Sequence, residues 1–317
     1  MKWIMRYDLD ENLQVILDRI DNKKDLLDSF RPLPEVLVRK FKENMSFEWT
    51  YHSNAIEGNT LTLNETRFII EEGLTINGKP LREHLEAINH HDAIVWLEDF
   101  VSNHEVLRER DILDIHALVM DKIDRQYAGR YRSAGVRITG ANFTPPNAHL
   151  VAELIEDLIQ WSESYQDIHP VLKSALFHHR FVWIHPFFDG NGRTTRLVSN
   201  IFMMQKGFPP AFILKSDRRK YYDGLNKANT GIMDKWFLLW FQSVERSLDL
   251  YLSHLDAERD DYQSLQSIVE ESAVPYGQEY LSLLARQGKI DAYKEGNVWY
   301  SSERAIKQYI IGRQRKR

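Results

Sequence analysis

The feature that most constrains the fold is the stretch from His185 to Arg196, which reads His-Pro-Phe-Phe-Asp-Gly-Asn-Gly-Arg-Thr-Thr-Arg. Pro186 restricts the residue before it to an extended backbone, so a helix that reaches this point has to end there. Two glycines then favour a tight turn, and apolar residues at helical spacing resume at Leu197. The stretch therefore predicts a helix, a turn and a second helix.

The same stretch brings together side chains that suit phosphate chemistry. A histidine titrates near neutral pH, so His185 can act as a general base. Asp189 offers the hard carboxylate oxygen that Mg²⁺ prefers. A glycine turn that leads into a helix N-terminus presents backbone N–H groups to an anion. Arg193 and Arg196 are three residues apart, so both can line the face at that turn. These groups together predict a site for phosphate chemistry.

The pattern closely resembles the signature of the Fic family, H-P-F-x-[D/E]-G-N-G-R-x-x-R. The resemblance implies a protein adenylyltransferase, which moves AMP from ATP onto a Ser, Thr or Tyr hydroxyl of a protein and releases pyrophosphate. The site residues that it implies are His185 and Asn191 for catalysis, Asp189 for Mg²⁺, Gly190 and Gly192 for the α-phosphate, Arg193 for the β-phosphate and Arg196 for the γ-phosphate. The Doc branch carries a lysine where this chain has Gly192, so the glycine favours AMP transfer.

A second motif lies more than a hundred residues upstream. Ser53, Glu57 and Gly58 can be read simply as a helix C-terminus with a left-handed glycine cap. Their spacing also resembles the Fic inhibitory motif, [S/T]-x-x-x-E-[G/N]. That resemblance implies that Glu57 pairs with Arg196 and takes the place of the ATP γ-phosphate. Arginine binds carboxylates and phosphates with the same bidentate geometry, so this substitution is physically sound.

A helix from about 217 to 229 is the expected binding site for the nucleoside. Tyr222 and Asn229 are seven residues apart and therefore lie on one helix face. Fic enzymes hold the adenine and ribose with a tyrosine and an asparagine on this helix. The resemblance implies that Tyr222 and Asn229 do so here, with Leu225 facing the base.

The segment 130–146 is the most strand-like part of the chain, because residues 136–139 alternate and glycines and prolines flank them. By itself this pattern predicts a surface hairpin. In Fic proteins the corresponding region is a β-hairpin flap, which holds the target protein by strand pairing. The resemblance therefore implies that a target presents its hydroxyl at 130–146.

Two pairs of adjacent histidines raise the alternative of a metal site. His90 and His91 precede Asp92 on a predicted helix, but neighbouring residues on a helix point about 100° apart and rarely share one metal. His178 and His179 lack a further candidate at ligand spacing before them. Both pairs are therefore interpreted as packing or capping groups.

Composition limits the classes of function. The net charge of −5 gives no global nucleic-acid footprint, and the absence of cysteine excludes disulfides and thiolate sites. No signal peptide or membrane-length apolar run is visible, so a cytoplasmic protein without a membrane contact is expected. Long segments of helical periodicity predict an all-α fold.

We expect three parts: an N-terminal helical region at 1–104 that carries the inhibitory motif, a Fic helical core with its β-hairpin flap at 105–255, and a small module at 256–317. The last begins with a charged linker at 256–261 and resembles a winged helix-turn-helix. It ends in a basic tail, so it is a candidate for DNA binding, although such modules also bind proteins. A homodimer is also left open.

Two alternatives to AMP transfer stay open. Glu57 could position a water molecule, so that the main activity is removal of AMP from modified protein. The chain could instead be a DNA-binding regulator whose catalytic core is kept shut. The sequence names neither the target protein nor the signal that would release Glu57.

Overall fold

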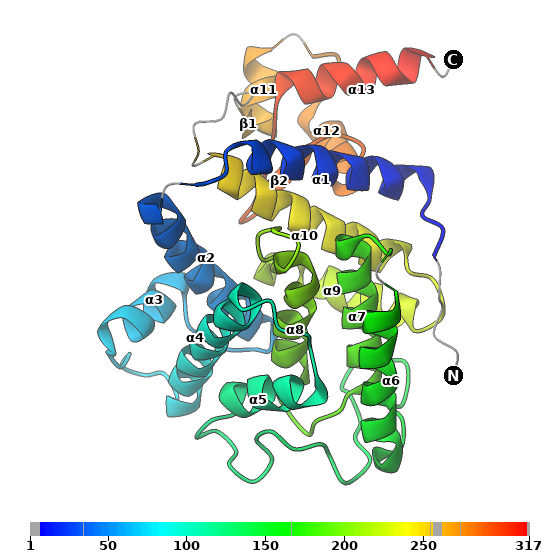
Figure 1. Ribbon diagram of the computed structural model, residues 1–317. Helices are drawn as coiled ribbons and strands as arrows, with labels where there is room; N and C mark the ends of the chain where they lie inside the picture. The colour runs from blue at the N-terminus through cyan, green and yellow to red at the C-terminus, as the bar shows by residue number, and fades with distance from the viewer. Residues whose placement is uncertain are drawn as a thin grey trace. The chain divides into compact units, whose positions relative to one another are not determined.

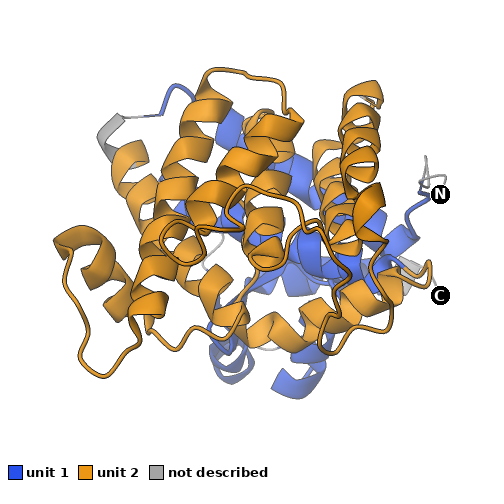
Figure 2. Ribbon diagram, turned by 90° about the horizontal axis from the view of Figure 1, so that it is seen from below, with its two compact units in different colours: residues 1–33, 233–317 blue, residues 34–232 orange. Residues whose placement is uncertain are grey.

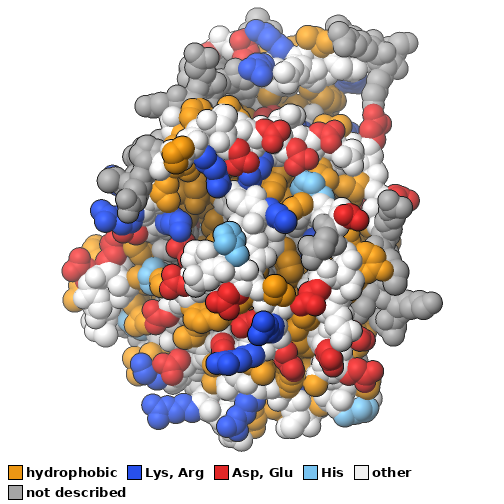
Figure 3. Space-filling view, viewed as in Figure 1, with side chains coloured by type: hydrophobic (Ala, Val, Ile, Leu, Met, Phe, Trp, Pro, Cys, Tyr) orange, Lys and Arg blue, Asp and Glu red, His pale blue; other side chains and the backbone are white. Residues whose placement is uncertain are grey.

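The computed structural model describes residues 7–33, 35–165, 167–253, 255, 262–272 and 274–315. Over these ranges the chain forms thirteen α-helices and a small antiparallel sheet of three strands, which confirms the predicted all-α class (Figure 1). None of the described helices is long and apolar enough to cross a membrane. Acidic and basic side chains are interspersed on the face shown in Figure 3. The predicted linker at 256–261 and the last two residues of the basic tail lie outside the described residues.

The chain divides into two compact units, residues 34–232 and residues 1–33 with 233–317 (Figure 2). This grouping does not follow the boundaries expected after 104 and 255. It arises because α1 (Glu11–Ser29) packs along α10 (Asp234–Ser253), which joins the first and last parts of the chain. The three-part division by function stays a prediction.

The unit 34–232 contains eight α-helices among its described residues. In chain order they are α2 (Glu35–Ile56), α3 (Leu63–Glu72), α4 (Leu81–Ser102), α5 (Glu109–Val119), α6 (Val151–Ser164), α7 (Pro170–Ile184), α8 (Asn191–Met204) and α9 (Arg218–Ala228). Two 3₁₀ turns, η1 (Ala148–Leu150) and η2 (Lys215–Asp217), precede α6 and α9. α7 and α8 pack against each other at the centre, where Phe177, Phe181 and Leu197 are fully buried (Figure 1).

Local sequence explains how these helices begin and end. Thr62 and Glu65 form a capping box at the start of α3, and Gly73 closes that helix in the left-handed conformation. α7 ends just before His185, and α8 begins directly after Gly190, whose φ is 75°. The predicted helix, turn and helix around the motif are therefore confirmed.

The segment 130–146 differs from the predicted hairpin, because it contains a turn but no paired strands. Side chains hold it instead of a strand ladder. The guanidinium of Arg132 donates to the carbonyls of Ala134 and Pro146, at 3.1 and 2.5 Å. Asn226 of α9 donates to the Gly140 carbonyl and accepts from the Asn142 N–H, at 3.1 and 3.3 Å. These side-chain bonds hold the segment without a strand ladder.

The second unit combines α1 and α10 with the C-terminal module. That module contains β1 (Gln263–Ser264), α11 (Leu265–Glu271), α12 (Gln278–Arg286), β2 (Ala292–Glu295), β3 (Val298–Ser301) and α13 (Glu303–Arg315). The strand order is β1-β3-β2, and the helices cover a small apolar core that includes Leu281 and Ile306. Helices with a β2–β3 hairpin agree with the expected wing, while the winged-helix assignment itself stays a prediction.

Buried ion pairs join the parts of this second unit. Lys23 of α1 lies 3.1 Å from Glu245 and 2.9 Å from Asp249, both on α10, and 2.6 Å from Asp291, just before β2. Arg19 binds both carboxylate oxygens of Glu245. Breaking such a buried network leaves uncompensated charge, so it fixes the module on α1 and α10.

Candidate active site

His185 lies at the end of α7, in the left-handed conformation with φ 51°. Its N–H donates to the Phe181 carbonyl at 3.0 Å, which closes the helix. Burial lowers the pKa of His185 to about 4, and the Val182 carbonyl offsets part of that shift. The imidazole is therefore neutral at pH 7 and able to accept a proton.

The loop after His185 is closed by Asn191. Its Oδ1 accepts from the Phe187 N–H and its Nδ2 donates to the Phe187 carbonyl, both at 2.9 Å. In this structure both ends of the amide hold the loop, and the catalytic role of Asn191 stays a prediction. Phe187 is fully buried and stacks on His116 with ring centroids 3.6 Å apart, so it anchors the loop.

His116 of α5 is a site residue that the sequence interpretation missed. Its Nε2 donates to the Asp189 carbonyl and its Nδ1 accepts from the Gly129 N–H, both at 3.0 Å. Burial lowers the pKa of His116 to about 4, so the ring stays neutral and keeps this tautomer. A signal was present, because His116 follows Ile112 and Ile115 at the spacing of the inward face of its helix.

Arg132 is a second missed residue, and it ties the segment 130–146 to the motif. Its Nε donates to the His185 carbonyl at 2.8 Å, and its own N–H donates to the Pro186 carbonyl at 2.9 Å. The side chain is only 2% exposed, and burial lowers its pKa. The acceptors of its guanidinium bonds are backbone carbonyls, a pattern that sequence spacing does not reveal.

Asp189 lies at the edge of the loop with a side chain that is half exposed. Its Oδ2 pairs with Arg82 of α4 at 2.5 Å, and its Oδ1 accepts from the Gly190 N–H at 2.6 Å. Burial raises the pKa of this carboxyl, but Arg193, Gly190 and Arg82 together lower it below its ordinary value. One ionised, accessible carboxylate is the donor set that Mg²⁺ uses with substrate phosphates, so the residues present fit this metal.

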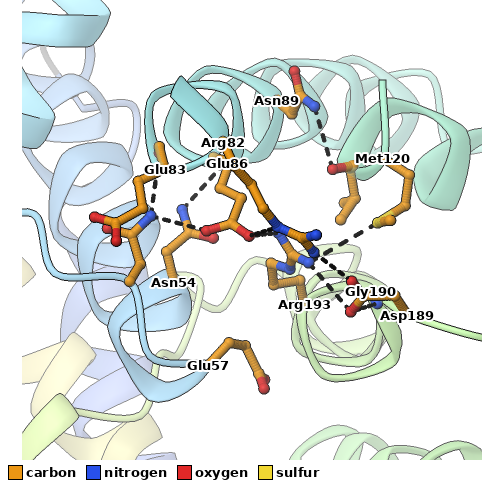
Figure 4. A network of polar contacts seen from close by, with 12 residues as sticks. Asn54, Glu57, Arg82, Glu83, Glu86, Asn89, Met120, Asp189, Gly190 and Arg193 are labelled. Carbon is orange, nitrogen blue, oxygen red and sulfur yellow. Dashed lines mark hydrogen bonds and ion pairs between the residues drawn. The ribbon is translucent and has the colours of Figure 1, made fainter. Parts of the chain in front are cut away.

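Arg193 projects toward α4 and lies in a charged network with Glu86 (Figure 4). Its Nη1 is 3.4 Å from the Glu86 carboxylate, and its Nη2 is 3.6 Å from Asp189. Glu86 also binds Arg82, at 3.2 Å, and Asn59, at 3.0 Å. Arg193 is buried, yet its Nε and Nη1 make no hydrogen bond, so the guanidinium keeps donors for a further acceptor.

Arg196 binds the upstream motif through its Nε and Nη2 atoms, as the resemblance implies. It donates to the hydroxyl and the carbonyl of Ser53, at 2.9 and 2.8 Å, and to Glu57 Oε1 at 2.7 Å. Burial alone would lower the pKa of Arg196, but Glu57 raises it above its ordinary value. A Cβ at Gly192 would overlap Glu57 Oε1, so the carboxylate lies against the first turn of α8. Gly58 follows with φ 105°, a conformation that favours glycine.

The expected nucleoside residues lie on or beside α9. The Tyr222 hydroxyl is 3.5 Å from the Ile56 carbonyl, in the last turn of α2 before Glu57. Leu225 is buried, and Asn229 caps the end of α9. Asn229 Oδ1 accepts from His179 Nε2 at 3.0 Å, which leaves its NH₂ group as a donor. The structure thus brings Tyr222 close to the inhibitory motif and fixes the orientation of Asn229.

The histidine pairs make packing and hydrogen-bond contacts. His90 Nδ1 lies 3.2 Å from the Thr50 hydroxyl, and His91 stacks on Phe47. His178 Nε2 lies 2.8 Å from the Tyr221 hydroxyl. Over the described ranges, no three side chains of His, Cys, Asp or Glu form a group that could hold a metal ion.

Similar proteins identify this arrangement. The Fic/DOC family matches residues 106–203. A protein adenylyltransferase Fic of Nematostella vectensis is 37% identical over 243 residues, which are 76% of this chain and 56% of that protein. The structure of a Fic-1 fragment from C. elegans has 34% identity and a TM-score of 0.68, over 76% of this chain and 73% of that chain. The chain belongs to the Fic/DOC family.

The likeness to one solved structure extends over almost the whole chain. A Fic family protein from Desulfovibrio desulfuricans G20 is 23% identical with a TM-score of 0.66, over 93% of this chain and 97% of that chain. The curated relatives are longer, and this Fic chain spans about half the length of those it matches.

Proposed function

We propose that this Fic chain is a protein adenylyltransferase that is held inactive by Glu57. The observation that carries the proposal is the position of the Glu57 carboxylate, bound to Arg196 at 2.7 Å and packed against Gly192 at the N-terminus of α8. Helix N-termini and arginines are the groups with which proteins bind phosphates. A carboxylate here is a stand-in for a phosphate, which indicates what the site accepts once Glu57 has left.

His185 is the proposed general base. As the hydroxyl oxygen of a target attacks the α-phosphorus of ATP, His185 takes the hydroxyl proton. The bond between the α-phosphorus and the oxygen that leads to the β-phosphate breaks, and pyrophosphate leaves. The neutral imidazole, with its pKa lowered by burial to about 4, is ready for this step at physiological pH. Arg132 holds the His185 backbone in place and acts through that residue.

The phosphates are proposed to bind along the motif. Backbone N–H groups from Gly190 to Gly192 face the α-phosphate, Arg193 the β-phosphate and Arg196 the γ-phosphate. Asp189 is the residue that would hold Mg²⁺, which would neutralise phosphate charge when bound. Before Mg²⁺ and ATP can bind in this way, the ion pair between Asp189 and Arg82 and the ion pair between Arg196 and Glu57 have to break.

The nucleoside and the target protein are proposed to bind on either side of the three phosphate positions. Tyr222, Leu225 and the NH₂ group of Asn229 are the candidates for adenine and ribose contacts. The segment 130–146 is mostly exposed and lacks strand partners of its own, so it can pair with an extended segment of a target protein. Recognition through main-chain bonds would place little demand on the target sequence.

The direct test is mass spectrometry of the Glu57→Gly variant after incubation with ATP and Mg²⁺, alone and with cell lysate. A mass addition equal to AMP on this chain or on a lysate protein is expected, with less addition for the native protein. The Glu57→Gly, His185→Ala double variant is the matched control and should show none. Equal labelling with and without Glu57 would refute the restraint, and absence of AMP addition from every variant would refute the transfer.

Removal of AMP is the second candidate. The Glu57 side chain is 34% exposed and lies beside the α8 N-terminus, where a carboxylate can orient a water molecule. In that case the native protein removes label from premodified protein, whereas Glu57→Gly does not. Cytoplasmic location, a homodimer and a DNA contact through 256–317 stay predictions.

A further inference from the structure

A cavity lies in the unit 34–232, away from the motif. Its volume is about 270 Å³, and its lining comes from the α4–α5 connection, the end of α6, the start of α7 and the end of α8. His185 is at the other end of α7, and Asn191 is at the other end of α8. At 1.5 Å per residue, α7 separates the cavity from His185 by about 20 Å. The cavity is therefore distinct from the proposed active site.

The most unusual group in this cavity is Lys173. Lys173 as a whole is only 7% exposed, and it lines the cavity. Its ammonium lies over the Phe202 ring, 5.4 Å from the centroid, but it makes neither a hydrogen bond nor an ion pair with the described residues. An ammonium that has lost part of its water and has no anionic partner is costly, even where it opens into a cavity. Natural proteins normally pair such a charge.

The neighbouring charges increase this imbalance. Burial and then Lys206, which also lines the cavity, lower the pKa of Lys173. Glu163 opposes them, but its effect is smaller than that of Lys206, and Glu163 is exposed at the rim. Two lysines thus line one cavity, and the acidic residues that line it with them are exposed to solvent. An anion between the two lysines would remove the repulsion.

Backbone groups at the cavity already have partners. At the start of α7, Pro170 has no N–H, the Val171 N–H donates to the His169 ring and the Lys173 N–H donates to the His169 carbonyl. At the end of α8, the Met203 carbonyl accepts from the Lys206 and Phe208 N–H groups, and the Met204 carbonyl accepts from Gly207. The two lysine side chains therefore carry the positive charge of the cavity.

We propose that this cavity binds a small oxyanion on Lys173 and Lys206, of the size of phosphate, pyrophosphate or a short dicarboxylate. Pockets for drug-sized ligands measure about 300–1,000 Å³, so the cavity is too small for a whole nucleotide. The ligand would touch the start of α7 and the end of α8, which are the two helices that the motif loop joins. It is thus placed to act on the loop without entering it.

The test uses the full ¹⁵N-labelled chain, titrated separately with inorganic phosphate, pyrophosphate and malonate at constant ionic strength. Amide shifts should saturate around Lys173 and Lys206, and the three titrants separate a phosphate site from a carboxylate site. Lys173→Met keeps the apolar stem over Phe202 and should weaken binding at this cavity about ten-fold or more, the usual scale for a lost charged hydrogen bond. Lys206→Gln should weaken it by a smaller factor, because Lys206 is exposed.

Two controls make the result decisive. Lys40→Met, at an exposed position on α2, should leave the affinity unchanged. The Tm of Lys173→Met without ligand should equal or exceed that of the native chain, since the variant removes a buried charge. Shifts that persist with the same affinity in Lys173→Met, or that fail to saturate around the cavity with all three anions, would overturn the proposal.

Discussion

The Glu57 carboxylate occupies the space that a side chain at Gly192 would need. A Cβ there would overlap Glu57 Oε1 and come within 3.0 Å of Arg196 Nη1. Gly192 therefore allows the inhibitory carboxylate to reach the α8 N-terminus, in addition to its proposed contact with the α-phosphate. The same small residue would then serve the restrained and the active state.

We predict that Gly192→Ala destabilises the native chain through Glu57. Overpacking typically costs about 1–3 kcal/mol, and here it has to displace Glu57 from Arg196. In a Glu57→Gly background the cost should be clearly smaller, since the remaining close atom is the end of a flexible arginine. A double-mutant cycle by urea unfolding measures the coupling. Equal costs in the two backgrounds would show that the carboxylate does not occupy this space in solution.

Arg82 is predicted to compete with metal ions at Asp189. The pair is short, at 2.5 Å, but both side chains are at least half exposed, so it is worth only about 0.2–1 kcal/mol. Arg82→Gln in the Glu57→Gly background should therefore tighten Mn²⁺ binding by at most about five-fold, measured by electron paramagnetic resonance with a non-transferable ATP analogue. Arg110→Gln, another exposed ion-paired arginine, is the matched control. Unchanged or weaker Mn²⁺ binding by Arg82→Gln would contradict the competition.

The motif and its helices could be predicted from sequence because they depend on short-range spacing and on a long, irregular pattern. The Glu57–Arg196 pair joins residues far apart in the chain, and only the family resemblance implied it. The supports of the motif could not be predicted. Arg132 binds carbonyls, which every residue carries, so nothing in the sequence marks its partners. The two bonds of Asn191 to Phe187 were not predicted either, because a side-chain amide can bind many different groups.

The segment 130–146 shows a different limit. Alternation at 136–139 predicts a strand, but a strand forms only where another strand lies beside it. Here the side chains of Arg132 and Asn226 bind the backbone of the segment, so the alternating sequence does not form the strand that it predicts. In the small sheet, by contrast, β2 and β3 are adjacent in sequence and a tight turn at Gly296 joins them. That pairing is local, because the two strands follow each other directly in the chain.

His116 is predicted to hold the start of the 130–146 segment to the motif loop. His116→Phe keeps a ring stacked on Phe187 but removes the bonds to Gly129 and Asp189. The expected loss of stability is about 1–3 kcal/mol, the cost of leaving buried polar groups without partners. Amide hydrogen exchange gives the specific signature. The Gly129 N–H should lose protection, while the Thr194 N–H, which binds the Gly190 carbonyl, keeps it. Parallel loss at both amides would indicate general loosening instead.

Stability is predicted to fall as the pH drops from about 6.5 to about 4. Burial lowers the pKa of His116, His179 and His185 to about 4, whereas an unfolded histidine titrates near 6.5. Between these values the unfolded chain binds more protons, so acid favours unfolding, with a limiting slope of about 1.4 kcal/mol per pH unit for each histidine. Carboxylates with lowered pKa values, such as Asp291 at about 2, lose their stabilising effect only below this window.

Urea unfolding at pH 7.5, 6.5, 5.5 and 4.5 measures this dependence. His116→Phe removes one of the titrating groups, so its curve should be flatter than the native curve by up to about 1.4 kcal/mol per pH unit. The exposed His149 is the matched position, and His149→Phe should keep the native slope. If His116→Phe and the native chain lost stability at the same rate below pH 6.5, His116 would not be buried and neutral. A protonated His116 ring cannot accept from the Gly129 N–H, so that result would also contradict the hydrogen bond between them.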